Sequence, residues 1–420
     1  MNLSAVRRES RFLVRDRSFI VWVGVSLLLA TLAVTGGMAE VQQQRQTIAE
    51  LLHSDRADRE EALADQSTWG GVAYYAFHLT YDPPSDFAFA AIGGRDQEPW
   101  KHRIRMLALE GQLYERDGGN PALALTGRFD FAFLLAYIIP LILIFLLHDL
   151  QSGERGAGRH TLLSATAGRA GSPWRVRALI RVSVLAVAVA APLVVASLAS
   201  GAKAGTVAVA LLVLIAYIVF WALLCYYLAK IDLSSSAILA RLLGIWVLLA
   251  VVTPAASKLA IDAAVPIPSG ADIVMTQREA VNDAWDLPKE TTMEAFVARY
   301  PEWGDYTEVT RPFEWKWYYA FQQVGDQATE ALAAAYQAGR QRRDYLTAIL
   351  VWLSPPALLE RVYQRLANTD ALARLRYEAS VRDFHERLRL FYYPKLFRDE
   401  PFDSQLLNEL PFYLTSEDGQ

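Results

Sequence analysis

The stretch VALLVLIAYIVFWALLCYYLA, residues 209–229, carries no charged side chain over its whole length. A helix needs roughly 20 mostly apolar residues to cross the hydrocarbon core of a bilayer, so this stretch alone predicts a membrane-spanning helix. The composition agrees, because 53% of the 420 residues are hydrophobic and only 20% are charged. That balance favours a membrane protein over a soluble one.

Other stretches of the chain are also long and apolar enough to span a bilayer. We expect spans at residues 19–39, 131–147, 182–202, 204–229 and 242–261. The first run is longer than the apolar core of a signal peptide, which favours a retained span over a cleaved leader. The predicted fold class is therefore mainly α, a polytopic membrane protein with two mostly helical extracytoplasmic regions.

One further stretch, residues 346–359, is uncharged but only 14 residues long, and it contains Pro355 and Pro356. Proline disfavours a helical conformation in the residue before it. We therefore expect a core or interfacial helix that ends at Ser354. A sixth membrane span is the alternative.

The positions of the basic residues predict the orientation, because short cytoplasmic loops are enriched in Lys and Arg. Arginine is frequent in residues 1–18 and 148–181, and residues 230–241 carry Lys230 and Arg241. We assign these segments to a cytoplasmic N-terminus, a cytoplasmic coupling loop and a second cytoplasmic loop. Residues 40–130 contain nine basic and fifteen acidic residues and are expected outside. Five spans then place residues 262–420 outside as an extracytoplasmic C-terminal domain.

The two outside regions are predicted from local patterns. Residues 40–68 have the composition of a polar surface helix, and a helical stretch near residues 356–390 precedes a loop-rich end. Phe313, Trp317 and Phe321 recur every four residues, which places them on one face of a helix. That face could pack into a domain core, rest on the membrane interface as an aromatic belt, or form a ligand-binding cage.

Several chemistries lack their sequence signatures. The phosphate-binding pattern GxxxxGK[ST] does not occur, and neither does HExxH or GxSxG. The six histidines show no metal-ligand spacing, and we expect Cys225 to be a small buried hydrophobic residue. A net charge of −4 gives no reason to expect nucleic acid. No ionisable residue lies in the middle of a predicted span, so any transport motion would be driven from outside this chain. We expect no enzymatic activity, no bound metal and no cofactor held by this chain.

The loop HDLQSGERGAGRHTLLSATAGRAGSPWRVRALIR, residues 148–181, is the most informative segment. A cytoplasmic motor must push on membrane helices through a rigid element, and a short amphipathic helix would serve. Glu154 and Arg155 offer charged contacts for such a motor, and Leu162 and Leu163 offer apolar ones. An ordinary basic inner loop is the alternative interpretation.

This loop is similar to the pattern D-x-x-S-G-E-R-E-x-G-T-L-x-L-L that follows the second span of ABC-2-type permeases. The chain resembles that family, and more narrowly a bacterial branch of unnamed function with large extracytoplasmic insertions. It departs from the pattern at Gly156, Arg159 and His160. The matching positions, to which the resemblance assigns coupling to an ATPase, are Asp149, Ser152, Gly153, Glu154, Arg155, Gly158, Leu162 and Leu163.

The resemblance to this branch extends along most of the chain. It includes GGRDQEP (residues 93–99), NPALALTGRFDFAF (120–133) with the IIPL that follows, LSPPALLERVYQRLANTD (353–370) and FYYPKLF (391–397). The motif positions are Gly94, Arg95, Asp96, Pro99, Asn120, Pro121, Gly127, Asp130, Pro140, Ser354 and Pro355.

The resemblance implies a membrane-spanning permease subunit of an ATP-driven exporter in a bacterial inner membrane. It implies a cytoplasmic ABC ATPase subunit that binds the ATP, a second permease subunit that is the same or a different chain, and membrane lipid around both. A membrane-anchored sensor or assembly factor, which uses its outside domains to bind a partner, is the alternative. The substrate cannot be inferred from the fold.

Overall fold

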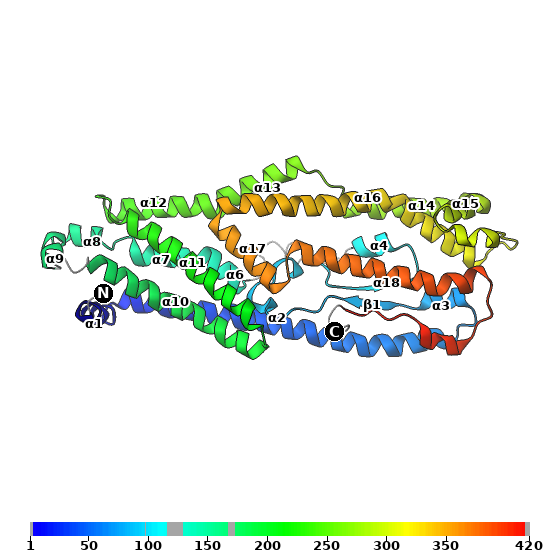
Figure 1. The fold of residues 1–420 in the computed structure, drawn as a ribbon, viewed down its shortest axis with the longest axis horizontal. Coiled ribbons are helices and arrows are strands. Elements are labelled where there is room, and N and C mark those ends of the chain that lie inside the picture. The colour runs from blue at the N-terminus through cyan, green and yellow to red at the C-terminus, as the bar shows by residue number, and fades with distance from the viewer. Residues whose placement is uncertain (1–2, 97, 116–128, 167–172, 416–420) are drawn as a thin grey trace.

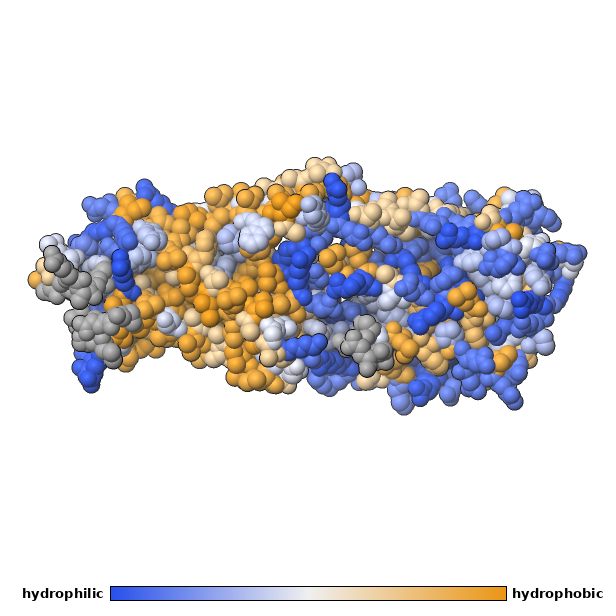
Figure 2. Space-filling model, in the orientation of Figure 1, coloured by the Kyte–Doolittle hydropathy of each residue, from blue (hydrophilic) through white to orange (hydrophobic). Residues whose placement is uncertain are grey.

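The computed structural model describes residues 3–96, 98–115, 129–166 and 173–415, and most of them are helical. The molecule is elongated, with its N-terminus at one end (Figure 1). Its surface is apolar over one half of the length and polar over the other, as Figure 2 shows. We call these the apolar half and the polar half. Each has its own core of buried hydrophobic side chains.

The apolar half contains helices packed roughly along the long axis (Figure 1). Within the described residues, five helical stretches are long and apolar enough to cross a membrane, which suggests a membrane location. Its elements are α1 (Leu3–Leu13), the first part of α2 (Arg17–Ala64), α6 (Phe131–Phe133), the π-helical η3 (Leu134–Ile138), α7 (Ile139–Leu147), α8 (Ser152–Gly156), α9 (His160–Thr166), α10 (Pro173–Ser200), α11 (Ala204–Leu228), α12 (Ser235–Val247), the π-helical η4 (Leu248–Val252) and α13 (Thr253–Ala264).

Helix α2 joins the two halves without a break. The sequence predicts a span at residues 19–39 and a separate polar helix at 40–68, but one helix of 48 residues covers both. At 1.5 Å per residue it is about 70 Å long. A side chain on Gly37 would collide with the Phe89 carbonyl oxygen, 2.0 Å from the position of a Cβ atom. This glycine therefore lets the short helix η1 (Ala88–Ala90) approach the α2 backbone.

The polar half contains α16 and α18, which run antiparallel to each other, and the distal part of α2, with a small sheet and short helices beside them (Figure 1). Strand β1 pairs with β2 in antiparallel register, with His78 opposite Ile104. Its elements are α3 (Trp69–Tyr75), β1 (His78–Tyr81), η2 (Gly93–Asp96), β2 (Lys101–Ile104), α4 (Leu109–Tyr114), α14 (Gly270–Asp286), α15 (Lys289–Arg299), η5 (Pro301–Tyr306), α16 (Trp315–Leu350), η6 (Val351–Leu353), α18 (Ala371–Phe397) and η7 (Ser404–Glu409).

The aromatic residues of α16 belong to the core of the polar half. Trp317 is 3% exposed and Phe321 is fully buried, and both pack against Trp285. Phe313 precedes the helix and is 43% exposed. The domain-core alternative is therefore confirmed for Trp317 and Phe321. The aromatic-belt alternative does not hold for these two residues, because both side chains are buried in that core and are not exposed to a membrane surface.

The chain re-enters the apolar half between α16 and α18. Helix α16 ends at Leu350, η6 follows, and Ser354 caps the next helix, α17 (Pro355–Ala367). Leu359, Tyr363 and Ala367 of α17 are buried in the core of the apolar half. The prolines thus stop the helix where the sequence predicts. Residues 346–359 form a turn that reverses the chain (Figure 1), which argues against a sixth helix through the bundle.

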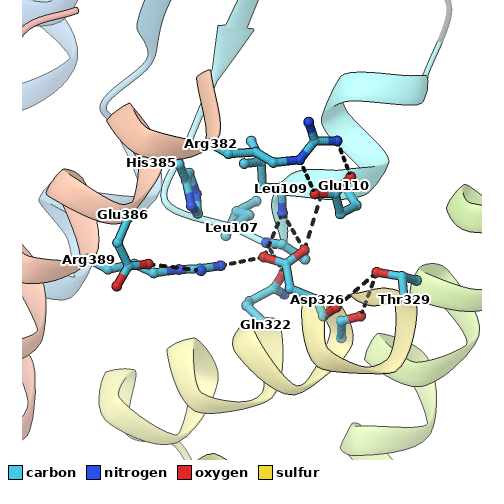
Figure 3. Close-up of polar contacts among 12 residues, drawn as sticks. Leu107, Leu109, Glu110, Gln322, Asp326, Thr329, Arg382, His385, Glu386 and Arg389 are labelled. Atoms are coloured by element: carbon cyan, nitrogen blue, oxygen red, sulfur yellow. Dashed lines mark hydrogen bonds and ion pairs between the residues drawn. The ribbon is translucent and has the colours of Figure 1, made fainter. Parts of the chain in front are cut away.

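Asp326 on α16 holds the helices of the polar half together. Its Oδ1 atom accepts hydrogen bonds from the Leu109 amide at 2.7 Å and from Gln277 Nε2 at 2.7 Å. Its Oδ2 atom pairs with Arg389 on α18 (Figure 3). A single carboxylate therefore links α4, α14, α16 and α18.

We predict that Asp326→Ala destabilises the protein by about 3–5 kcal/mol, because removing one partner of a buried ion pair leaves the other charge uncompensated. Denaturant unfolding of the purified protein in detergent, followed by tryptophan fluorescence, measures the change. The exposed Asp305 provides the control variant, Asp305→Ala. Equal stability of the two variants would contradict the role of Asp326.

Candidate functional site

Two of the described apolar helices combine a π-helical turn with a proline, and the structure supplies donors for the carbonyls that are freed. Pro140 follows η3 and Pro254 follows η4. Proline has no N–H, and a π-helical turn shifts the bonding partner to residue i−5, so carbonyls one turn before each proline lose their donors. The Tyr217 hydroxyl donates to the Ala136 carbonyl at 2.5 Å, and the Ser354 hydroxyl donates to the Leu249 carbonyl at 2.7 Å.

Helix α17 forms hydrogen bonds with the apolar helices at more than one position along its length. The Tyr363 hydroxyl donates to the Ala210 carbonyl on α11 at 2.9 Å. The Tyr137 hydroxyl donates to the Glu360 carboxylate at 3.0 Å. Pro355 is the first residue of α17, where the missing N–H has no intrahelical partner to lose. The motif positions Ser354 and Pro355 therefore set where α17 begins and how deep it lies.

Several motif segments that are far apart in sequence meet where α17 leaves the apolar half. The Gly94 amide donates to the Thr369 carbonyl at 3.3 Å, and the Thr369 hydroxyl donates to the Ala91 carbonyl at 2.8 Å. Gly93 has a φ of +57°, and a Cβ there would lie 2.8 Å from the Thr369 carbonyl oxygen. Asp130 caps α6 and also accepts the Ile92 amide at 3.0 Å.

Arg95 is the central charge of this region. It pairs with Asp82 and donates to Gln44 Oε1 of α2 at 3.1 Å. Burial raises the pKa of Asp82, and the Arg95 guanidinium opposes that rise. Arg95 and Asp82 line a cavity of about 240 Å³, together with Gly94, Glu98, Pro99, Arg340 and Arg374. We call the residues of this region the waist cluster: Asp82, Gly94, Arg95, Glu98, Asp130, Arg340 and Thr369.

The waist cluster joins the two halves mechanically. Its charges of opposite sign are paired within the chain, as with Arg340 and Glu98 at 2.7 Å. Its hydrogen bonds link α2, η2 and the segment that follows α17. Pro140 lies in the neighbouring span and Asp96 lies in η2. Asn120, Pro121 and Gly127 are outside the described residues.

The other motif residues gather at the opposite end of the apolar half. Glu154 accepts from Arg159 at 2.8 Å and from Arg177 at 3.2 Å, and Arg177 also binds Glu9 of α1 at 3.1 Å. Arg155 donates to the carbonyls of Ile231 at 2.6 Å and Lys230 at 2.7 Å. We call this end the loop cluster; its motif members are Asp149, Ser152, Gly153, Glu154, Arg155, Gly158, Leu162 and Leu163.

Further bonds tie the loop cluster to the ends of the apolar helices. Ser152 and Ser235 share a hydrogen bond of 2.8 Å between α8 and α12. Arg181 of α10 lies 3.3 Å from Asp16, which caps α2, and 4.0 Å from Asp149. The short helices α8 and α9 are thus anchored to α1, α2, α10 and α12.

Some side chains of the loop cluster make contacts within the chain, and others are exposed on the surface. The side chains of Glu154 and Arg155 are 16% and 22% exposed and are used in contacts within the chain. Leu162 is 66% exposed, whereas Leu163 packs against the apolar core. Gly158 has a φ of +70° and forms the turn between α8 and α9. The surface that α8 and α9 offer to a partner therefore includes Arg159 and Leu162 more than Glu154.

Comparison with known proteins identifies one domain. Residues 272–414, about a third of the chain, match the family model of a domain of unknown function, DUF3526. The match begins within α14 and includes α16, α17 and α18. No curated protein matches the chain, and no solved structure matches it.

We predict that Tyr217→Phe destabilises the apolar half by about 1–3 kcal/mol, because the buried Ala136 carbonyl loses its donor. The thermal midpoint in detergent should fall accordingly. Tyr227→Phe is the matched control, since Tyr227 lies on the same helix and is 61% exposed. If both variants unfolded at the wild-type temperature, the Tyr217 bond would contribute nothing to stability.

Proposed function

We propose that this chain is the membrane-spanning permease subunit of an ATP-driven ABC-2-type exporter. Two findings support the general class. The five long apolar helices suggest a membrane location. The matched DUF3526 domain is associated with ABC-2 permease-like proteins in general. In this proposal the ATP is bound by a separate cytoplasmic ABC ATPase, and the chain pairs with a second permease subunit, either a copy of itself or a different chain.

The loop cluster is the observation that carries the proposal. An ATPase must transmit force through an element that is exposed and also firmly joined to the spans. Helices α8 and α9 present Arg159 and Leu162 outward, while Arg155 fixes them to the 230–232 loop and Glu154 fixes them to α10. A simple membrane anchor needs no such arrangement.

The proposed orientation follows from charge. The loop cluster and the N-terminus carry the arginine-rich segments and lie on the cytoplasmic face, in accordance with the preference of Lys and Arg for that side. The polar half then projects on the opposite side of a bacterial inner membrane. Helix α17 enters the bundle from that side, and the waist cluster links movement of the spans to movement of the polar half.

The alternative is a membrane-anchored sensor or assembly factor. The polar half has a hydrophobic core of its own and a large cavity. These features favour the alternative, because a separately folded domain can bind a partner without any transport. The two proposals differ in the partner that they require, a cytoplasmic ATPase for the permease and an outside protein for the anchor.

Purification of the tagged protein from membranes of its own host, followed by mass spectrometry, tests the proposal. We expect a stoichiometric ABC ATPase to accompany the wild-type protein. Leu162→Glu should reduce the recovered ATPase at least tenfold, because a charge replaces an exposed apolar contact.

Val14→Glu is the matched control for this experiment. Val14 is 73% exposed in the turn between α1 and α2, at the same end of the molecule. This variant should retain the ATPase, and both variants should reach the membrane in normal amounts. Recovery of an outside protein with no ATPase would instead support the anchor.

A further inference from the structure

The polar half contains a cavity of about 710 Å³ that none of the contacts described above uses. It lies between the distal part of α2, strand β1, helix α18 and the C-terminal segment 402–413. Its size falls in the range of ordinary small-molecule sites. Arg59 on α2 lines it, and this residue is 20 positions beyond residue 39, or about 30 Å along the helix. The cavity is therefore far from the apolar half.

The wall of the cavity is largely hydrophobic. It includes Leu63 of α2, Leu79 of β1, Phe384 of α18, and three side chains of the C-terminal segment, Phe402, Leu410 and Phe412. The charged residues Arg56 and Glu60 lie on the exposed face of α2 and form part of the rim. The cavity could therefore hold the apolar part of a ligand.

Polar atoms without partners adjoin this apolar wall. His78 is 1% exposed, and among the described residues neither of its ring nitrogens has a hydrogen-bond partner. Arg59 pairs with Asp55 through one nitrogen, but its Nε and Nη1 atoms are buried without a partner in the described chain. Buried polar groups in proteins are nearly always bonded, so these two residues beside the cavity can supply hydrogen bonds to a ligand.

The polar atoms that have no hydrogen-bond partner indicate the chemistry of the polar end, or headgroup, of a ligand. Arg59 and His78 supply four such atoms: two guanidinium nitrogens, which only donate, and two imidazole nitrogens, of which one donates and one accepts when the ring is neutral. Asp55 Oδ1 also has no hydrogen-bond partner in the described chain, but it forms an ion pair with Arg103 at 3.8 Å. Burial, with a contribution from Arg59, lowers the pKa of His78 to about 3, so the ring is neutral at pH 7. Because Nη2 of Arg59 already pairs with Asp55, the two free nitrogens cannot form a parallel fork, but Nε–H and Nη1–H can each donate one charge-assisted hydrogen bond to a carboxylate.

We propose that this cavity binds a long-chain carboxylate, with the alkyl chain among Leu63, Leu79, Phe384 and Phe402 and the carboxylate against Arg59 and His78. Phe412, whose ring lies 5.1 Å from the Arg59 guanidinium carbon, covers the headgroup. The proposal stands apart from the permease assignment, because it concerns residues of the polar half alone. It assigns this half a ligand that is held outside the bilayer.

Photolabelling of the full-length protein in nanodiscs tests the proposal. The probe is palmitate that carries a photoactivatable diazirine on its chain, and mass spectrometry maps the labelled peptides. We expect labelling within residues 52–66 and 402–413. Unlabelled palmitate should compete at least tenfold better than methyl palmitate, which lacks the negative charge. Labels confined to the apolar helices, or equal competition by the ester, would overturn the proposal.

Variants of the cavity distinguish the loss of the headgroup contact from a failure of the protein to fold. Arg59→Gln and His78→Phe should each reduce labelling of these peptides at least tenfold. Arg56→Gln removes an exposed cation at the rim and should change it less than twofold. Leu407→Trp fills the cavity while leaving Arg59 in place, and it should abolish labelling even if Arg59→Gln fails to fold. Undiminished labelling of a folded Leu407→Trp protein would show that the ligand binds elsewhere.

Discussion

The backbone of an apolar bundle has no water to bond with, so a proline that opens a helix must be matched by a donor from elsewhere. Pro254 imposes this requirement near Leu249, and Ser354 meets it. Since Ser354 begins α17, the bond brings a segment of the C-terminal region into the apolar core. Tyr363 and Glu360 then fix the depth of α17 through Ala210 and Tyr137. The position of the polar half follows from these contacts.

The waist cluster is a consequence of that insertion. Because α17 ends beside η2, Thr369 reaches Gly94 and Ala91, and Arg95 in turn reaches Gln44 on α2. The described motif residues that the family resemblance singles out lie in three places. One set anchors the short helices of the loop cluster, a second joins the bundle to the polar half, and Pro140, Ser354 and Pro355 lie within the bundle.

Much of the architecture could be predicted from the sequence, because long apolar runs, turn-forming prolines and clustered arginines are local signals. The five apolar helices and the stop before Ser354 were predictable in this way. Contacts between distant segments were not. The inward orientation of Glu154 depends on Arg177, and the bond from Tyr217 to Ala136 depends on how α7 and α11 pack. The prolines did carry a usable signal, since each predicts a carbonyl that needs a donor, but the identity of the donor is set by tertiary packing.

The length of α2 has a geometric consequence. An unbroken helix of 48 residues cannot bend sharply without losing backbone hydrogen bonds, so it transmits rotation over its full length of about 70 Å. A tilt of about 10° at its first turn would displace its far end by about 12 Å. The side chains near that far end, including Asp55 and Arg59, would be carried the same distance. The helix can thus convert a small movement at the end of the apolar half into a larger movement in the polar half.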